Sequence, residues 1–85
     1  MTIDYHNDFI KTFKKLPLKV KNQFKERQLL FEKDQFNPTL NNHALKGKYQ
    51  GYRSINIAGD LRAIFQKENQ NIIFVKIGSH SKLYG

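Results

Sequence analysis

The sequence contains no cysteine, which excludes a disulfide framework, a thiolate nucleophile and cysteine-based zinc sites. It also has no apolar run that approaches the roughly 18 residues of a membrane-spanning helix. Residues 1–8 lack the basic and apolar regions of a signal peptide. These absences together predict a soluble, cytoplasmic protein.

Acidic residues are few. Seven Asp and Glu stand against fifteen Lys and Arg, so the formal net charge is +8. On a chain of 85 residues, such an excess favours nucleic acid or an acidic protein as the partner. The length predicts a single domain, residues 1–85, without room for a second core. Seven Phe and four Tyr are enough to build that core without covalent cross-links.

Two basic helices are predicted in the N-terminal half from apolar residues that recur at helical spacing. The first begins near Asn7, which is predicted as its N-cap, and Pro17 marks its end. The second runs from residue 17 or 18 to about residue 33. Its apolar stripe is Val20, Phe24, Leu29, Leu30 and Phe31, and its polar face carries Lys19, Lys21, Lys25 and Arg27.

Three strand-like runs follow the turn-rich segment 34–51. They cover residues 52–57, 61–67 and 72–77, and residues 2–5 are compatible with a short edge strand. A glycine-containing turn joins the first two runs into a hairpin. The prediction is an α+β fold, in which a short N-terminal strand and a two-helix hairpin accompany a three- to four-stranded antiparallel sheet.

The last of these runs carries a single charge. Strict alternation places Lys76 on the same face as Ile72 and Phe74, and Ile77 on the opposite face. A lone lysine near the end of an apolar strand is often a surface residue whose stem packs along apolar side chains. Because His80 follows closely in the sequence, a functional role for Lys76 is the alternative.

Two histidines and an aspartate flank the predicted strands: His43, Asp60 and His80. Within a basic domain they predict acid–base chemistry on a polyanion, with RNA favoured, because the unperturbed pKa of histidine is about 6.5. Each residue has a simpler alternative, since His43 could only hydrogen-bond its loop and Asp60 could only serve its turn. The spacing of His6, His43 and His80 does not suit a metal ion, so no metal site is expected.

Four motifs in the C-terminal half have a distinctive order and spacing. They are His43-Ala44-Leu45-Lys46-Gly47, Gly51-Tyr52-Arg53, Asp60, and Gly78-Ser79-His80-Ser81-Lys82-Leu83-Tyr84. In this order they resemble the YafQ branch of the RelE/ParE superfamily, which comprises bacterial toxins of type II toxin–antitoxin systems. The resemblance implies a ribosome-dependent endoribonuclease that cuts mRNA in the translating ribosome and needs no metal or other cofactor. It also implies a tightly bound antitoxin, which we expect to be acidic because the toxin is basic.

The resemblance implies roles for individual residues. His43, Asp60 and His80 become the catalytic set, with His80 as the main acid–base group and His43 or Asp60 as its counterpart. One group would take the proton of the ribose 2′-OH and another would protonate the departing 5′-oxygen. The candidate RNA and phosphate contacts are Lys46, Arg53, Arg62, Lys76 and Tyr84. The cations would stabilise the developing charge, and the tyrosine would stack on an unstacked base. Arg53 could instead hold the sheet to the preceding loop.

Two positions depart from the family pattern. Asn56 stands where YafQ-like toxins commonly have a third histidine, and Leu61 stands where an aromatic residue often follows the aspartate. An asparagine takes up no proton near pH 7, so only a hydrogen-bonding role survives at position 56. Two alternatives stay open: a ParE-like toxin that inhibits DNA gyrase, and a catalytically impaired RNA- or partner-binding member of the same fold. His43 and His80 argue against the first, and Asn56 favours the second.

Overall fold

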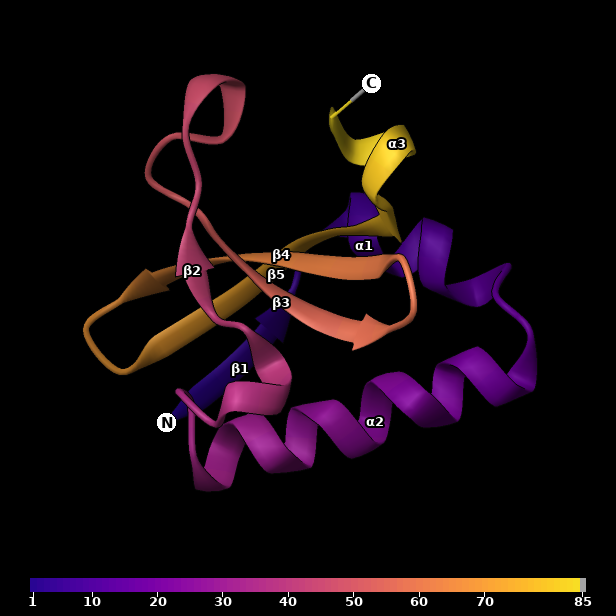
Figure 1. Cartoon of the computed structure of the whole chain (residues 1–85), viewed down its shortest axis with the longest axis horizontal. Coiled ribbons are helices and arrows are strands. Elements are labelled where there is room, and N and C mark those ends of the chain that lie inside the picture. Colours follow the sequence, from indigo (N-terminus) through magenta and orange to yellow (C-terminus); the bar gives the residue numbers. More distant parts are fainter. Residues whose placement is uncertain (85) are drawn as a thin grey trace.

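A five-stranded sheet forms the centre of the computed structural model, which describes residues 1–84 (Figure 1). The strand order is β1-β5-β4-β3-β2. The strands are β1 (Thr2–Tyr5), β2 (His43–Ala44), β3 (Arg53–Ala58), β4 (Leu61–Glu68) and β5 (Asn71–Ser79). β1 pairs with β5 in parallel, and the other pairs are antiparallel.

The sheet confirms the α+β class and is wider than the three to four strands expected. The three predicted strands form its middle, and β1 and β2 extend it at its two edges. β2 has only two residues, which is too short for a period of two to be recognised in the sequence. β1 runs parallel to β5 rather than antiparallel, and the long stretch of chain between these two strands allows such a parallel pair.

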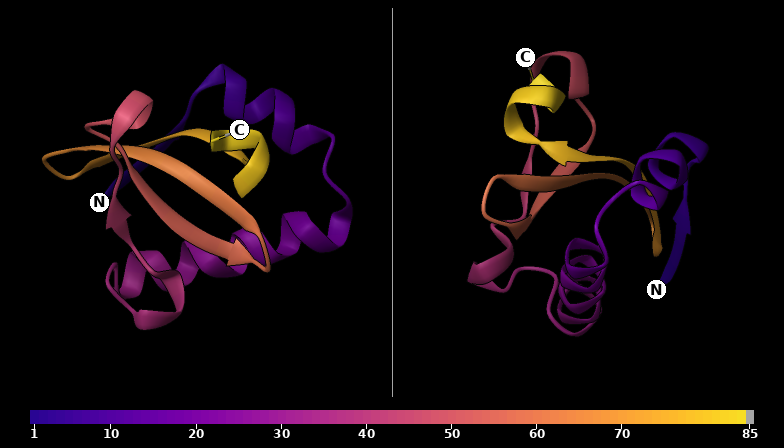
Figure 2. Two further views of the ribbon diagram at one scale, coloured as in Figure 1. Left: turned by 45° about the horizontal axis from the view of Figure 1, so that its top comes forward. Right: turned by 90° about the vertical axis from the view of Figure 1, so that its right-hand side faces the viewer.

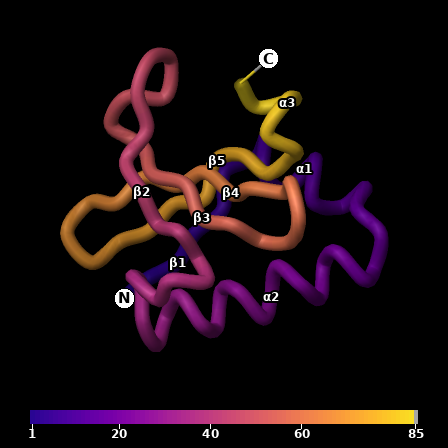
Figure 3. Tube along the Cα trace, viewed as in Figure 1, coloured from indigo at the N-terminus to yellow at the C-terminus, as the bar shows by residue number. Residues whose placement is uncertain are grey.

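Three α-helices and two 3-10 turns complete the fold. They are α1 (Asn7–Lys14), α2 (Leu18–Lys33), the 3-10 turns η1 (Pro38–Leu40) and η2 (Gly47–Tyr49), and α3 (His80–Tyr84). α1 and α2 pack on one side of the sheet, whereas α3 and the segment that contains η2 lie on the other side (Figure 2). The trace in Figure 3 shows these two pieces at the same end of the molecule, and the rings of Tyr49 in η2 and Tyr84 in α3 lie with centroids 5.7 Å apart. We call the face of the sheet away from α1 and α2 the open face.

His6, rather than the predicted Asn7, is the N-cap of α1. Its Nδ1 accepts a hydrogen bond from the backbone N–H of Asp8 at 3.1 Å. The imidazole thus accepts the hydrogen bond that a side-chain oxygen of Asn, Asp or Ser accepts at most helix N-termini. The predicted N-cap was wrong by one residue. α2 begins directly after Pro17, as predicted.

The inner face of α2 differs from the predicted stripe at two residues. Phe24 and Phe31 are buried as expected, but Leu29 is 62% exposed. At 3.6 residues per turn, Leu29 lies about 140° around the helix from Phe24, whereas Arg27 lies within about 60° of it. Arg27 therefore faces the sheet, where its Nε donates to the backbone carbonyl of Ile57 at 3.1 Å. Within residues 1–84, no helix is long and apolar enough to cross a membrane.

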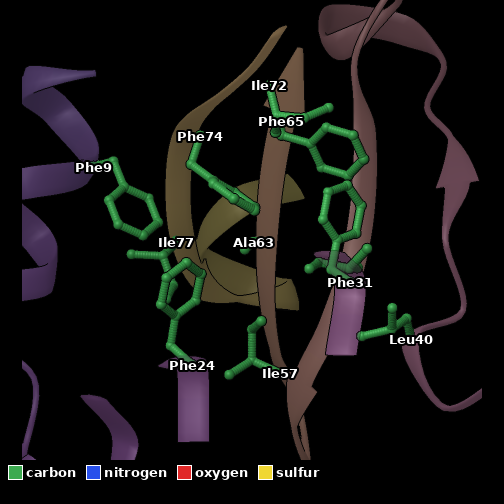
Figure 4. Close-up of a cluster of buried hydrophobic side chains, with 11 residues drawn as sticks. Phe9, Phe24, Phe31, Leu40, Ile57, Ala63, Phe65, Ile72, Phe74 and Ile77 are labelled. Atoms are coloured by element: carbon green, nitrogen blue, oxygen red, sulfur yellow. The ribbon is translucent and has the colours of Figure 1, made fainter. Parts of the chain in front are cut away.

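Aromatic rings dominate the core between the helices and the sheet (Figure 4). Phe9 of α1, Phe24 of α2 and Phe74 of β5 lie with ring centroids 5.2–5.8 Å apart. Such pairs add to the free energy gained by burying the rings. The buried cluster comprises Phe9, Phe24, Phe31, Leu40, Ile55, Ile57, Ala63, Phe65, Ile72, Phe74 and Ile77.

A β-bulge in β5 changes which side chains reach the open face. Ile64 of β4 pairs with Lys76, but the next residue, Phe65, pairs with Phe74, so Val75 is an extra residue. An extra residue shifts the alternation of every side chain beyond it. Strict alternation was therefore wrong at the end of this strand. Ile77 is 3% exposed in the core with Phe74, and Lys76 projects from the open face.

Candidate functional site

The pairing register gathers polar residues on the open face. Asn56 of β3 pairs with Arg62 of β4. His43 of β2 and Lys76 of β5 are the two ends of one row of paired residues that runs across the sheet through β3 and β4. Paired residues of neighbouring strands project from the same face of a sheet. These four residues therefore share one face, although they come from four different strands.

His43 has its ring fixed by the loop before β2. Its Nδ1 lies 2.8 Å from the carbonyl oxygen of Asn41. A carbonyl oxygen only accepts hydrogen bonds, so Nδ1 carries the proton and Nε2 of the neutral ring holds the free lone pair. The side chain of His43 is exposed, and Nε2 is thus available to a substrate as a base. His43 can therefore hold its loop through Nδ1 and act on a substrate through Nε2, so the structural and the chemical role are compatible.

His80 and Asp60 are brought together at the hairpin turn between β3 and β4. The backbone N–H of His80 donates to the carbonyl oxygen of Asp60 at 3.1 Å. Arg62 joins the same turn, since its Nη1 donates to the carbonyl oxygen of Gly59 at 2.8 Å. The ring of Tyr84 lies against that of His80, with centroids 4.7 Å apart. We call Asp60, Arg62, His80 and Tyr84 the turn cluster.

The turn cluster combines the groups that acid–base chemistry requires. The side chains of Asp60 and His80 are exposed, so both are accessible to a ligand. A carboxylate can only accept a proton, an imidazole can accept or donate one, and a guanidinium stays charged. Four of the eight site residues expected from the sequence thus lie together.

Lys76 forms an ion pair with a residue that the sequence did not single out. Its Nζ donates to Oδ2 of Asp8, in the first turn of α1, at 3.1 Å. This hydrogen bond, together with the positive charge of Lys76, holds the pKa of the Asp8 carboxyl below its usual value. Both side chains remain about half exposed, so an anionic ligand can compete with Asp8 for Lys76.

A hollow of about 670 Å³ lies between α1 and the end of β5. The described residues that line it include no Asp or Glu, but four lysines: Lys11, Lys15, Lys76 and Lys82. Within residues 1–84, only Lys76 of these four forms a salt bridge. We call this the lysine hollow. Its charge favours phosphate groups, and it lies next to the turn cluster because Ser79 and Lys82, which flank His80 in the chain, also line it.

Two of the expected contacts lie apart from these groups. Arg53 points from the face of β3 that also bears Ile55, so it is on the helix side of the sheet. Its Nε donates to Oδ1 of Asn42 at 2.8 Å, and its guanidinium lies 5.6 Å from the ring centroid of Phe36. Lys46 is exposed and directly precedes η2, so it comes from a different segment than the turn cluster.

Asn56 and Ser54 stand out because each has a buried oxygen without a hydrogen-bond partner in residues 1–84. Most buried polar atoms in proteins do have a partner, so these two oxygens are unusual. Both lie on β3 and face the open side, next to the residues described above. Sequence reasoning noticed Asn56 only as a departure from a family pattern and missed Ser54, which has no local signal beyond its place in an alternating strand.

No group of three or more His, Asp or Glu side chains in residues 1–84 is arranged to hold a metal ion.

Comparison with known proteins identifies relatives of the whole chain. The family model of YafQ, a bacterial toxin of type II toxin–antitoxin systems, matches residues 1–85. Among solved structures, YafQ from E. coli strain BL21(DE3) is 24% identical, with a TM-score of 0.81 over 98% of this chain and 97% of that chain. A chain of the E. coli DinJ-YafQ toxin-antitoxin complex is 25% identical, with a TM-score of 0.77 over 98% and 96%.

A more distant relative shares the fold alone. The YoeB/ParE toxin from Agrobacterium tumefaciens is 14% identical, with a TM-score of 0.76 over 94% of this chain and 99% of that chain. A search of the curated proteins found no match. The family match spans every residue and agrees with the order of helices and strands, so this chain belongs to the YafQ family of bacterial toxins of type II toxin–antitoxin systems.

Proposed function

We propose that this toxin is a cytoplasmic, ribosome-dependent endoribonuclease that cleaves mRNA by acid–base chemistry through the ribose 2′-OH. The observation that carries the proposal is the turn cluster, in which the 3.1 Å hydrogen bond from the backbone N–H of His80 to the backbone carbonyl of Asp60 holds these two residues at one turn. Arg62 is held on the same turn by its hydrogen bond to Gly59. An acid, a base and a cation within one exposed cluster are the groups that this reaction needs.

The chemistry of the side chains suggests how the protons move. The carboxylate of Asp60 takes the proton of the 2′-OH, and Nε2 of His43 is the alternative base. The 2′-oxygen attacks the phosphorus, and protonated His80 gives its proton to the departing 5′-oxygen. The products are a 2′,3′-cyclic phosphate and a 5′-OH. His80 suits the acid role because an imidazole, unlike the carboxylate and the guanidinium of the cluster, can both accept and donate a proton.

The cations of the open face would stabilise the negative charge that develops on the phosphate. Arg62 belongs to the turn cluster itself, and Lys76 can leave Asp8 when RNA binds. The lysine hollow would hold neighbouring phosphates of the same strand or of ribosomal RNA. Tyr84 would stack on an unstacked base beside His80, and Lys46 would contact the backbone from the exposed η2 segment.

We also propose that a cognate acidic antitoxin neutralises this toxin. The net charge of +8 favours an acidic segment as its partner. The solved relative in the E. coli DinJ-YafQ complex supports an antitoxin partner, because that complex contains a toxin of the same family. A catalytically impaired, RNA-binding toxin is the second candidate, favoured by Asn56 and its unpartnered Oδ1.

An in vitro translation assay tests the catalytic proposal. Purified toxin is added to translating ribosomes, and cleavage of the mRNA at the A site is mapped by primer extension. We expect cleavage by the unmodified protein and at least a hundred-fold slower cleavage by His80→Gln, because general acid catalysis contributes about 10²–10⁴-fold. Cleavage that persists unchanged in His80→Gln would overturn the role of His80. No cleavage, combined with inhibition of gyrase in a supercoiling assay, would establish the ParE-like alternative instead.

A further inference from the structure

A second hollow lies on the open face, on the other side of Lys76 from the lysine hollow. It measures about 350 Å³, and its walls come from the start of α1 and from the segment around η2. Apolar Ile73 and Val75 of β5 contribute to its lining, together with Tyr49 and Tyr52. We call it the aromatic hollow. Lys76 lines both hollows, so the two lie on either side of its side chain.

The two tyrosines are held in place by their neighbours. The ring of Tyr49 meets that of Tyr52 edge to face, with centroids 6.4 Å apart, and that of Tyr84 with centroids 5.7 Å apart. The backbone N–H of Tyr52 also donates to the carbonyl oxygen of Tyr49 at 3.0 Å, which closes the segment around η2 into a turn. Tyr49 is therefore fixed between two other rings. Aromatic rings that are fixed next to apolar residues of a strand suit a flat ligand, which can stack on them.

Charge decides which flat ligand fits. Nζ of Lys48 lies 5.3 Å from the ring centroid of Tyr49, and His6 and Lys76 line the opposite side. Asp8 is the one acidic group among the described residues of the lining, and it is already paired with Lys76. Gln66 adds an amide that can both donate and accept hydrogen bonds. An aromatic wall next to cations matches a nucleotide, which has a flat base and an anionic phosphate.

We propose that the aromatic hollow binds one unstacked base of a single-stranded RNA, next to the phosphate that lies at Lys76. This inference rests on the proposed function and adds a subsite to it, with Tyr49 and Tyr52 as the stacking residues and Gln66 at the edge of the base. The strand would continue from Lys76 toward the turn cluster and the lysine hollow. The aromatic hollow then selects the nucleotide that flanks the cleaved bond.

NMR titration of the unmodified protein tests the base subsite without any substitution. The free protein is titrated with AMP and, in parallel, with ribose 5-phosphate, which carries the same phosphate and sugar but no base. We expect AMP to shift the ring signals of Tyr49 and Tyr52 and the methyl signals of Ile73 and Val75, and ribose 5-phosphate to leave them in place. Equal shifts with both compounds, or no shift with AMP, would overturn the proposal.

A pair of variants tests the role of stacking. Tyr52→Phe keeps the ring and Tyr52→Leu removes it while preserving apolar bulk, and amide spectra verify that both are folded. Binding of a short fluorescein-labelled oligoadenylate is measured by anisotropy. We expect Tyr52→Phe to bind like the unmodified protein and Tyr52→Leu to bind about ten-fold more weakly. Equal affinity of all three proteins would contradict base stacking.

These measurements use the free protein without ribosomes, so they separate the subsite from the catalytic proposal. Cleavage in the translation assay without a response to AMP would leave the endoribonuclease intact and overturn the subsite. A response to AMP without cleavage would leave the subsite in place and overturn the catalytic role of the turn cluster.

Discussion

Lys76 and Asp8 are 68 positions apart in the sequence, yet Nζ of the lysine donates to Oδ2 of the aspartate at 3.1 Å. Asp8 stands at the start of the first helix, and Lys76 follows the bulge in the last strand. The pair thus joins α1 to the open face. It also neutralises one of the cations that the proposed RNA site needs, which makes Asp8 an internal competitor of the RNA phosphate.

Asp8→Asn is expected to strengthen RNA binding. The substitution frees Lys76 for a phosphate, so the affinity for a short single-stranded RNA should rise. The slope of log Kobs against log salt should steepen by about 0.7, the value for one additional contact with single-stranded nucleic acid. Asp34→Asn is the matched control, because it removes the same charge at the end of α2, away from Lys76. Equal effects of both variants would show that only net charge matters.

The pair should also be visible in the titration of Asp8. The pKa of Asp8 is lower in the folded protein than in the unfolded chain, where it is close to 3.8. Above that unfolded value, the pair with Lys76 contributes fully to stability. This contribution is lost as the pH falls through the lowered pKa of the folded protein. Lys76→Met is expected to raise the pKa of Asp8 toward 3.8, as followed by the carbon-13 shift of its carboxyl group. Lys82→Met, which removes a lysine without a contact to Asp8, should leave that titration in place.

Restoring a histidine at position 56 should increase activity. Asn56 is half-buried on the open face, opposite Arg62, and its Oδ1 has no partner in residues 1–84. A histidine there adds an acid–base group, so Asn56→His should cleave mRNA at least ten-fold faster in the translation assay. Asn56→Gln keeps the amide and serves as the control. Unchanged cleavage by Asn56→His would mean that position 56 does not exchange protons with the substrate.

Arg53→Met is expected to reduce stability without changing RNA affinity. Its guanidinium hydrogen-bonds Asn42 and lies over Phe36, so it ties the loop before β2 to the sheet. Loss of these contacts should lower the free energy of unfolding by about 1–2 kcal/mol, measured in urea. A double-mutant cycle with Asn42→Ala checks that this partner accounts for the loss. Weaker RNA binding by folded Arg53→Met would restore the phosphate-binding role expected from the sequence.

The lysines that line the lysine hollow should contribute more to RNA affinity than lysines elsewhere on the protein. Replacing both Lys11 and Lys15 by Ala should reduce the salt slope for single-stranded RNA by about 1.4, which corresponds to two phosphate contacts. Replacing Lys19 and Lys33 of α2 removes the same charge without touching the lining of the lysine hollow and should change the slope less. Equal slopes for the two double variants would show that RNA binding depends on the net charge of the protein rather than on the lysine hollow.

The sequence predicted the elements whose signals are local. α2 begins after Pro17, and the hairpin turn at Gly59 was recognisable because glycine readily adopts the positive φ of 50° found there. The joining of His80 to Asp60 followed from a family motif rather than from any periodicity. Local patterns therefore predicted the α+β class, and the catalytic roles of His43, Asp60 and His80 stay a prediction.

Features that depend on pairing across the fold could not be predicted. The bulge at Val75 is invisible in an apolar run, yet it decides that Lys76 faces the open side and that Ile77 enters the core. The partner of Lys76 lies 68 positions away, and nothing near Asp8 indicates it. The aromatic hollow likewise needs β5 and η2 to be placed next to each other before its rings and its cations form one surface.

The place of β5 in the sheet determines when this protein can fold during its synthesis. β5 lies between β1 and β4, but it is the last strand to be made. Until it emerges, β1 has no neighbour in the sheet and Phe9 of α1 lacks its partner Phe74. Such non-local pairing forms late and slowly. His80 follows β5 directly, so the nascent chain acquires its acid–base group only when the last of these five strands has been made.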